Sequence, residues 1–391
     1  MNMSFSMYVP TRVLFGVGEL SNLHKQKMPG KKALIVISNG KSTKANGYLS
    51  RTEEQLKLAG IESVVFAEVQ PNPLKSTVMA GASFAKENRC DFIVALGGGS
   101  CIDAAKAIAV MATNEGDYWE YVSAGSGKGQ SMKHKPLPLI AITTTAGTGS
   151  EIDPWAVVTH ETNHEKIGFG TDGMFPVLSI VDPELMTTVP PKFTAYQGFD
   201  ALFHSIEGYI SKNANPYSDI HAIASLENVG RNLARAVQDE NDIDAREKVA
   251  FGNTLAGVVL YISSTTSEHS LEHAMSAFHQ DLPHGAGLIM ISKAYFMHFI
   301  NKHVCDDRFI RMAQAIGMES AAAPMDFITA LVKLQEDCGV ADLKMSDYGI
   351  TPDELETLAK NVKETMGRSF LADRCELSIE DCVAIYRDSY K

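Results

Sequence analysis

The chain has 391 residues, enough for two domains, and its 45% hydrophobic and 21% charged residues are ordinary for a folded globular protein. Its formal net charge of −12 argues against a nucleic-acid partner, because binding to phosphate backbones requires a basic face. No apolar run reaches the roughly 18 residues that a membrane span needs, so we expect no membrane partner either.

The N-terminus and the cysteines indicate where the protein works. The first residues, MNMSFSMYVPTRVLFG, lack the basic and apolar regions of a secretory signal. The six cysteines are scattered and form no C-x-x-C pair, which favours reduced thiols over a disulfide framework or a thiolate zinc site. We therefore expect a cytoplasmic protein, and we expect no sulfur among the ligands of any metal ion that it binds.

Short apolar runs alternate with helical patterns in the first half of the chain. Strands are predicted at 31–38, 62–69, 91–100, 136–145 and 177–183, and helices at 48–60 and 101–113. This alternation is typical of βαβ units and predicts a mainly parallel sheet.

Beyond Pro190 and Pro191 the strand patterns largely disappear. Long patterns with apolar residues at helical spacing follow at 199–211, 218–237, 245–262 and 324–339. We therefore predict an α/β N-terminal domain of Rossmann-like type, residues 1–186. An all-α C-terminal domain, residues 187–391, is predicted to follow.

A glycine-rich loop ends the third predicted strand. In LGGGSCIDAAKAIAV, Gly97, Gly98 and Gly99 directly precede a helix, and Ser100 and Asp103 have the spacing of an N-terminal capping pair. Glycines let the backbone approach a ligand, and the N–H groups of a helix N-terminus bind an anion such as pyrophosphate. A tight turn without a ligand explains the glycines equally well.

A second loop, TTTAGTGSEID at 143–153, follows the next predicted strand and is rich in hydroxyl side chains. Ligands of open α/β sheets bind at such strand ends. The two loops together therefore favour a nucleotide cleft over two coincident turns.

Histidines and one aspartate form another group of candidate residues. Asp200 and His204 are four residues apart on a predicted helix, so they share one face, although an intrahelical hydrogen bond explains this pair equally well. The stretch LEHAMSAFHQDLPHG adds His273, His279 and His284. A buried aspartate with three histidines suits a divalent metal ion.

These motifs resemble those of the iron-containing (group III) alcohol dehydrogenases, which have the dehydroquinate synthase-like superfold. The resemblance runs nearly end to end, in the same order, through VPTRVLFGVGEL, NPLKSTV, ALGGGSCIDAAKAIA, ITTTAGTGSEID, SIVDPELMTTVPPKFTAYQGFDALFHSIEGYIS and LEHAMSAFHQDLPHG. It implies that Asp200, His204, His273 and His284 hold Fe²⁺. No general base stands out elsewhere in the sequence, and none is required if the metal lowers the pKa of the alcohol, so we expect no catalytic residue beyond this metal shell. Ligand chemistry alone also allows Zn²⁺.

One departure from the family pattern concerns the histidines. Many members carry H-A-x-A-H, with a further histidine near the substrate, whereas this chain has Ala277 at that position and a shorter loop to PHG. We expect His279 to be a pocket or surface residue and not a catalytic one, because its register differs.

The resemblance also implies contacts to a nicotinamide cofactor. The expected contacts are Asn72 on the adenine side, Gly98, Gly99, Ser100 and Asp103 at the pyrophosphate, Thr144, Thr145 and Thr148 nearby, and Lys166 and Leu185 on the ribose or nicotinamide side.

The end of the first predicted strand bears on the choice of coenzyme. NAD-preferring members often have an acidic residue where this chain has Ser38, and Lys41 and Lys44 follow without a nearby carboxylate. A carboxylate would repel a 2′-phosphate, so this pattern favours NADP(H) over NAD(H). Lysines on a solvated turn explain it too.

The expected function is that of a metal-dependent alcohol dehydrogenase or aldehyde reductase. It would transfer a hydride between NAD(P)(H) and a short primary alcohol, a diol or the corresponding aldehyde, with the metal acting as a Lewis acid. The alternatives are glycerol dehydrogenase-, maleylacetate reductase- or dehydroquinate synthase-like activity on the same scaffold, or a non-enzymatic nucleotide-binding protein. The resemblance also implies a homodimer or larger homo-oligomer.

Overall fold

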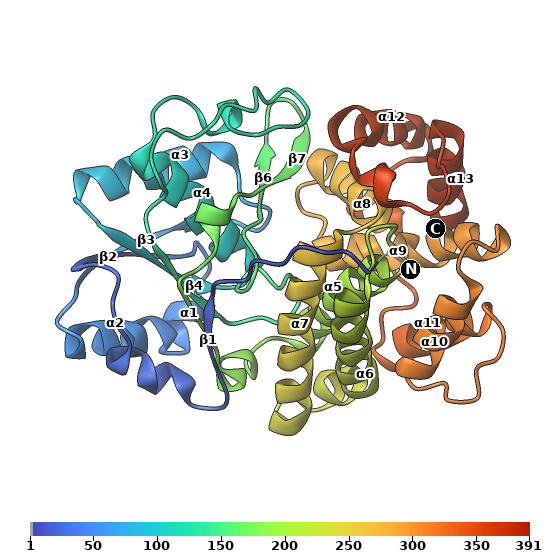
Figure 1. The fold of residues 1–391 in the computed structure, drawn as a ribbon, viewed down its shortest axis with the longest axis horizontal. Helices are drawn as coiled ribbons and strands as arrows, with labels where there is room; N and C mark the ends of the chain where they lie inside the picture. Colours follow the sequence, from blue (N-terminus) through green and yellow to red (C-terminus); the bar gives the residue numbers. More distant parts are fainter. Residues whose placement is uncertain (1–2) are drawn as a thin grey trace. The chain divides into compact units, whose positions relative to one another are not determined.

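The computed structural model describes residues 3–391, which divide into two compact units (Figure 1). The α/β unit comprises Tyr8–Thr145 and Ser150–Thr188, and the helical unit comprises residues 3–7, Ala146–Gly149 and Val189–Lys391. The main division thus follows Thr188, against the 186/187 boundary expected from the sequence. The transfer of Ala146–Gly149, part of the second predicted loop, to the helical unit was not expected.

The α/β unit is built on a six-stranded parallel sheet with the strand order β1-β8-β5-β4-β2-β3. Its strands are β1 (Arg12–Phe15), β2 (Lys32–Ser38), β3 (Glu62–Val69), β4 (Phe92–Gly97), β5 (Leu139–Thr143) and β8 (Leu178–Val181). The predicted parallel sheet is confirmed. β1 and the antiparallel hairpin of β6 (Ala156–His160) and β7 (Glu165–Phe169) were not predicted, because polar or charged residues interrupt their short apolar runs, whereas the equally short β5 and β8 are buried throughout.

Helices cover both faces of this sheet, as Figure 1 shows. They are α1 (Ser42–Ala45), α2 (Tyr48–Leu58), α3 (Lys75–Glu87) and α4 (Gly99–Thr113), with short 3₁₀ helices η1 (Glu19–Lys25), η2 (Tyr118–Glu120), η3 (Asp172–Met174) and η4 (Pro183–Met186). Leu34 and Val36 of β2 pack in the core under α3 and α4, whereas the alternate residues Ala33, Ile35 and Ile37 pack under η1 and α2. A strand buried on both faces reads as one continuous apolar run, which is why β2 is recognisable in the sequence.

The helical unit confirms the predicted all-α half of the chain. Its helices are α5 (Pro191–Ile210), α6 (Pro216–Gln238), α7 (Ile243–Ser263), α8 (Ser267–Phe278), α9 (His284–Asn301), α10 (Asp306–Ala315), α11 (Asp326–Asp337), α12 (Leu355–Met366) and α13 (Ile379–Ser389). The 3₁₀ helices η5 (Met345–Tyr348), η6 (Pro352–Glu354) and η7 (Ser369–Ala372) connect some of them.

Local sequence signals set where two central helices of this unit begin. Proline opens both α5 and α6, because the first helical position needs no backbone N–H donor. Asn215 caps α6 by accepting hydrogen bonds from the backbone N–H groups of Tyr217 and Ser218 at 3.1 Å each. The rings of Phe203, Phe296 and Phe327 then fill the core, with centroids 6.0 Å apart for the first pair and 5.4 Å for the second.

Among the described residues, no single helix has both the length and the apolar composition of a membrane span. The pair α7 and α8 meets that test only jointly, across a bend of 104°.

Candidate functional site

Helix α5 presents three acidic or imidazole side chains to the interior of the helical unit. Asp200, His204 and Glu207 lie at i, i+4 and i+7 and therefore share one helical face. All three are buried, and Glu207 is fully so. Polar groups buried this deeply must find partners, because burying them alone is costly.

The partners come from α8 and from the start of α9. Nε2 of His269, on α8, lies 3.3 Å from Oδ1 of Asp200, and Nε2 of His284, the first residue of α9, lies 3.6 Å from the same oxygen. Nδ1 of His204 lies 3.3 Å from it as well. Three imidazoles from three helices thus converge on one carboxylate oxygen.

Two buried glutamates hold the far sides of two of these rings. Nδ1 of His269 donates a hydrogen bond to Oε1 of Glu207, and Nδ1 of His284 donates one to Oε2 of Glu272. Both glutamates are fully buried. Metal-binding histidines typically have such a carboxylate on the nitrogen that does not face the metal.

Three of the four residues expected to bind metal are brought together, namely Asp200, His204 and His284. The fourth, His273, lies next to them, with its ring centroid 5.3 Å from that of His284 and its Nδ1 3.3 Å from Sδ of Met366. The group able to share one ion with Asp200 consists of His269 and His284, whereas His273 groups with Glu272 and His284.

Reasoning from the sequence missed His269. The signal was the spacing of His269 and His273, which puts both rings on one face of α8, one turn apart. Spacing alone cannot say which of the two points at Asp200, so only the packing of α8 against α5 distinguishes them.

The electrostatics of this cluster suit a cation. Burial raises the pKa of Asp200, but His204, His284 and His269 outweigh burial and bring it down to about 2. Burial lowers the pKa of His204 to about 4, with His269 adding to the effect. Burial also disfavours the charged form of His269, yet Glu207 and Asp200 raise its pKa to about 10. These shifts favour an ionised Asp200 and a protonated His269, and a divalent ion would displace the proton of His269.

The remaining candidates of this half lie outside the cluster. His279 is the C-cap residue of α8, and its Nε2 lies 3.4 Å from Oε1 of Glu354 in η6.

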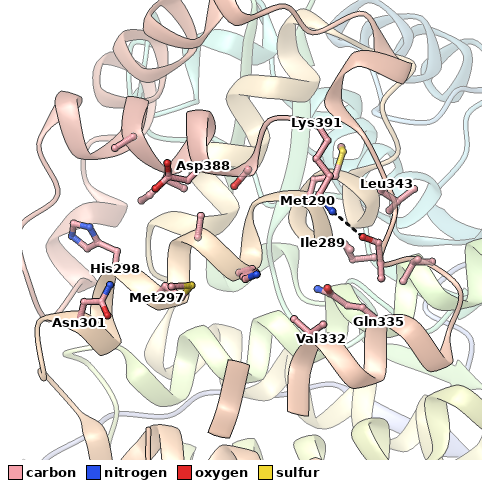
Figure 2. Close-up of a pocket in the computed structure, with 17 residues that line it drawn as sticks. Ile289, Met290, Met297, His298, Asn301, Val332, Gln335, Leu343, Asp388 and Lys391 are labelled. Atoms are coloured by element: carbon pink, nitrogen blue, oxygen red, sulfur yellow. Dashed lines mark hydrogen bonds between the residues drawn. The ribbon is translucent and has the colours of Figure 1, made fainter. Parts of the chain in front are cut away.

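A cavity of about 470 Å³ lies between α9, α11 and α13 (Figure 2). Figure 2 shows Met290, Val332 and Lys391 among its lining residues, and none of the clustered histidines or acids lines it. The cavity therefore does not belong to the metal cluster.

In the α/β unit the two glycine-rich loops touch one another. Gly98 is the N-cap residue of α4, and a Cβ atom there would lie 2.9 Å from Cγ2 and Oγ1 of Thr145. Thr144 and Thr145, both partly exposed, follow β5 beside this loop. Only glycine leaves room at position 98 for the second loop to pass this close, so the two loops lie side by side where β4 and β5 end.

The expected capping pair of Ser100 and Asp103 is wrong. Ser100 lies within the first turn of α4, which has no side-chain cap, because the helix begins at Gly99. Asp103 is buried instead, and its two oxygens accept hydrogen bonds from Oγ of Ser150 at 2.5 Å and from the backbone N–H of Val157 at 3.0 Å. A partner distant in sequence has thus replaced the local one.

Lys106, one turn further along α4, completes this buried cluster. Its fully buried Nζ donates to Oγ of Ser150 at 2.7 Å, to Oδ1 of Asp153 at 3.0 Å and to the carbonyl of Trp155 at 2.7 Å. Burial raises the pKa of Asp153 to about 7 although Lys106 opposes the shift, and burial also raises that of Asp103. The cluster fastens the end of the second loop to the helix that follows the first.

Of the other residues expected to contact the cofactor, two are hydrogen-bonded to each other and the rest lie apart. Nζ of Lys166 donates to Oδ1 of Asn72 at 3.0 Å, and both residues are buried, so these two are brought together. Ser38 is half-buried at the end of β2. Leu185 lies fully buried in the apolar core below the sheet, and Thr148 belongs to the helical unit.

Comparisons with known proteins agree along the whole chain. The family model for iron-containing alcohol dehydrogenase matches residues 10–183, and the model for the C-terminal region of the Fe-containing alcohol dehydrogenase family matches residues 194–390. The chain is 31% identical to a 1,3-propanediol dehydrogenase of Klebsiella pneumoniae, over 99% of this chain and 100% of the relative. It is also 31% identical to an NAD-dependent methanol dehydrogenase of Bacillus methanolicus, over 92% of this chain and 93% of the relative.

A solved structure supports the same assignment. An archaeal halo-thermophilic alcohol dehydrogenase from a Red Sea brine pool superimposes with a TM-score of 0.92 at 33% identity, covering 100% of both chains. The chain therefore belongs to the iron-containing alcohol dehydrogenase family and is a nicotinamide-dependent oxidoreductase that acts on alcohols.

Proposed function

We propose that this enzyme interconverts a short primary alcohol or diol and the corresponding aldehyde, with one Fe²⁺ per chain. The observation that carries the proposal is the convergence of His204, His269 and His284 on one oxygen of Asp200. One carboxylate and three imidazoles, with no sulfur, form a donor set that suits Fe²⁺ and also Zn²⁺.

For the third histidine ligand we propose His269 in the place first assigned to His273. Its Nε2 lies 3.3 Å from Asp200, and its Nδ1 is held by a buried carboxylate, whereas Nδ1 of His273 faces a thioether sulfur. A carboxylate partner favours the tautomer whose other nitrogen carries a free lone pair.

The overall reaction transfers a hydride from the alcohol carbon to the nicotinamide and releases the hydroxyl proton, giving the aldehyde and the reduced coenzyme. When bound, the metal supplies Lewis acidity toward the substrate oxygen. Asp200, His204, His269 and His284 would hold the metal ion, and the burial of the first three would keep water away from it. The first glycine loop and the N-terminus of α4 would bind the pyrophosphate through backbone N–H groups.

For the coenzyme we propose a preference for NADP(H). The support is local: β2 ends in Ser38, Lys41 and Lys44 are exposed beyond it, and no acidic residue occurs between positions 38 and 47. The methanol dehydrogenase relative is named as NAD-dependent, so the preference needs a direct test. Ser38→Asp should lower the ratio of kcat/KM for NADP⁺ over NAD⁺ at least tenfold, because the added carboxylate repels the 2′-phosphate.

We also propose that the enzyme works in the cytoplasm, which the absence of any disulfide among its six cysteines supports. The homo-oligomeric state implied by the family resemblance stays a prediction.

The metal content of three proteins tests the central proposal. Wild-type protein, His269→Ala and His273→Ala would be purified without oxygen, reloaded with Fe²⁺ and analysed for iron, with circular dichroism as the folding control. We expect about one ion per chain in the wild type and in His273→Ala, and a loss only in His269→Ala. Loss of iron in His273→Ala with retention in His269→Ala would restore the first assignment.

A further inference from the structure

The metal cluster includes two acidic residues that have no expected role as ligands. Glu207 and Glu272 are fully buried, and each accepts the Nδ1–H of a different histidine, His269 and His284 respectively. We propose that Glu207 and Glu272 are positioning residues of the metal centre, each fixing the tautomer and ring orientation of one ligand. This inference rests on the proposed metal site.

The tautomer decides whether a histidine can bind metal with a given nitrogen. A neutral imidazole has one N–H and one free lone pair, so a carboxylate that takes the N–H at Nδ1 leaves the lone pair on Nε2. Nε2 is the nitrogen that faces Asp200 in both His269 and His284. His204 differs from both, because it has a hydrogen bond with the backbone of Gly147. The two glutamates therefore act on two of the three imidazoles.

Glu207 is itself held in place by a second donor. Oγ1 of Thr266, the N-cap residue of α8, donates to Oε2 of Glu207 at 3.0 Å while Oε1 accepts from His269. The carboxylate of Glu207 on α5 thereby links to two points of α8. A residue pinned at both oxygens can set the orientation of the ring that it holds.

The side chain of Glu272 packs against Gly287, where any larger residue would collide with it. A Cβ atom at Gly287, in the interior of α9, would lie 2.6 Å from Cγ of Glu272 and 3.0 Å from its Oε1. Glycine inside a helix is unfavourable by roughly 0.5–1 kcal/mol relative to alanine, so a purely local requirement would not select it. The space at Gly287 is what allows Glu272 to reach His284.

Glu268 offers a matched control on the same helix. It is fully buried like Glu272, but neither of its carboxylate oxygens has a hydrogen-bond partner within residues 3–391. Glu268 therefore holds no histidine, and Glu268→Gln changes the same chemical group at another buried position of the same helix.

The test is the equilibrium affinity for Co²⁺, measured by chelator competition and by the visible spectrum of the bound ion, in the wild type and in Glu207→Gln, Glu272→Gln, Glu272→Leu and Glu268→Gln. We expect losses of about tenfold for the two glutamine variants at 207 and 272, because an amide oxygen still accepts the N–H, and about 100-fold for leucine. Glu268→Gln should stay within about threefold of the wild type.

Gly287→Ala provides a second route that changes no acid and no ligand. The added methyl group displaces Glu272 while favouring the helix, so we expect about a tenfold loss of Co²⁺ affinity without a loss of helical content. This variant and Glu272→Gln decide the matter if Glu272→Leu does not fold. Equal affinities in the Glu207, Glu272 and Glu268 variants would overturn the positioning role. A wild-type protein that binds no Co²⁺, Fe²⁺ or Zn²⁺ would instead overturn the proposed metal site.

Discussion

Replacing Lys106 with methionine should destabilise the α/β unit strongly and in a pH-dependent way. The change removes the ammonium group of Lys106 from a buried cluster and deletes donors to Ser150 and Asp153 at 2.7 and 3.0 Å. Breaking a buried ion pair by removing one partner costs about 3–5 kcal/mol in the free energy of unfolding, because the remaining charge is left uncompensated. Methionine fills a similar volume, so lost packing contributes little.

The pH dependence follows from Asp153. The pKa of Asp153 in the folded protein is raised to about 7, above its ordinary value of 3.8. Protonated Asp153 therefore contributes to the stability of the folded state below pH 3.8, and this contribution is lost as the pH rises through about 7. Lys106 lowers the pKa of Asp153, so its removal should raise that pKa further, and the loss of stability with rising pH should continue to higher pH values. We therefore expect the difference between wild type and variant to be larger at pH 8 than at pH 6.

Denaturant midpoints at pH 6 and pH 8, followed by circular dichroism, measure this effect, and the KM for coenzyme measures its consequence for the second loop. In Lys106→Met/Asp153→Asn one unpaired acid is also removed, so part of the stability should return. An unchanged midpoint in Lys106→Met at both pH values, or a double variant less stable than the single one, would refute the reasoning.

Two further changes test local features of the fold. Gly98→Ala should raise the KM for coenzyme by a larger factor than it lowers kcat. The added Cβ would lie 2.9 Å from Thr145 and push the two loops apart. Steady-state kinetics with varied coenzyme concentration measure both constants. Asn215→Ala should cost about 1 kcal/mol in the free energy of unfolding, because α6 loses its side-chain cap, and a shift in the denaturant midpoint without a change in kcat would report it.

The features that could be predicted are those that a single segment determines. β2 and β4 are buried on both faces, so each appears in the sequence as an unbroken apolar run. The spacing of Asp200 and His204 likewise lies within one helix. Asp103 shows the opposite case, because its partner Ser150 is 47 residues away and outcompetes the local capping position.

The choice between His269 and His273 could not be made from the sequence for the same reason. Both lie on one face of α8, and the difference between them is a contact with Glu207, which α5 supplies from 62 residues away. β1 and the hairpin of β6 and β7 escaped prediction because polar or charged residues interrupt their apolar runs, whereas β5 and β8 are equally short but buried throughout.

The burial of acids around the cluster is itself an argument for a cation. Asp200, Glu207 and Glu272 are buried within reach of the same imidazoles, and replacing buried charged groups with apolar residues of similar size is often neutral or stabilising. Stability alone therefore gives no reason to keep three carboxylates together in the interior of a helical unit. Lys106 in the α/β unit comes with its own acids as counter-charges, whereas the hydrogen bonds described for Asp200 and Glu207 come from His269 and Thr266. A divalent ion held by Asp200, His269 and His284 would supply a positive charge at this point.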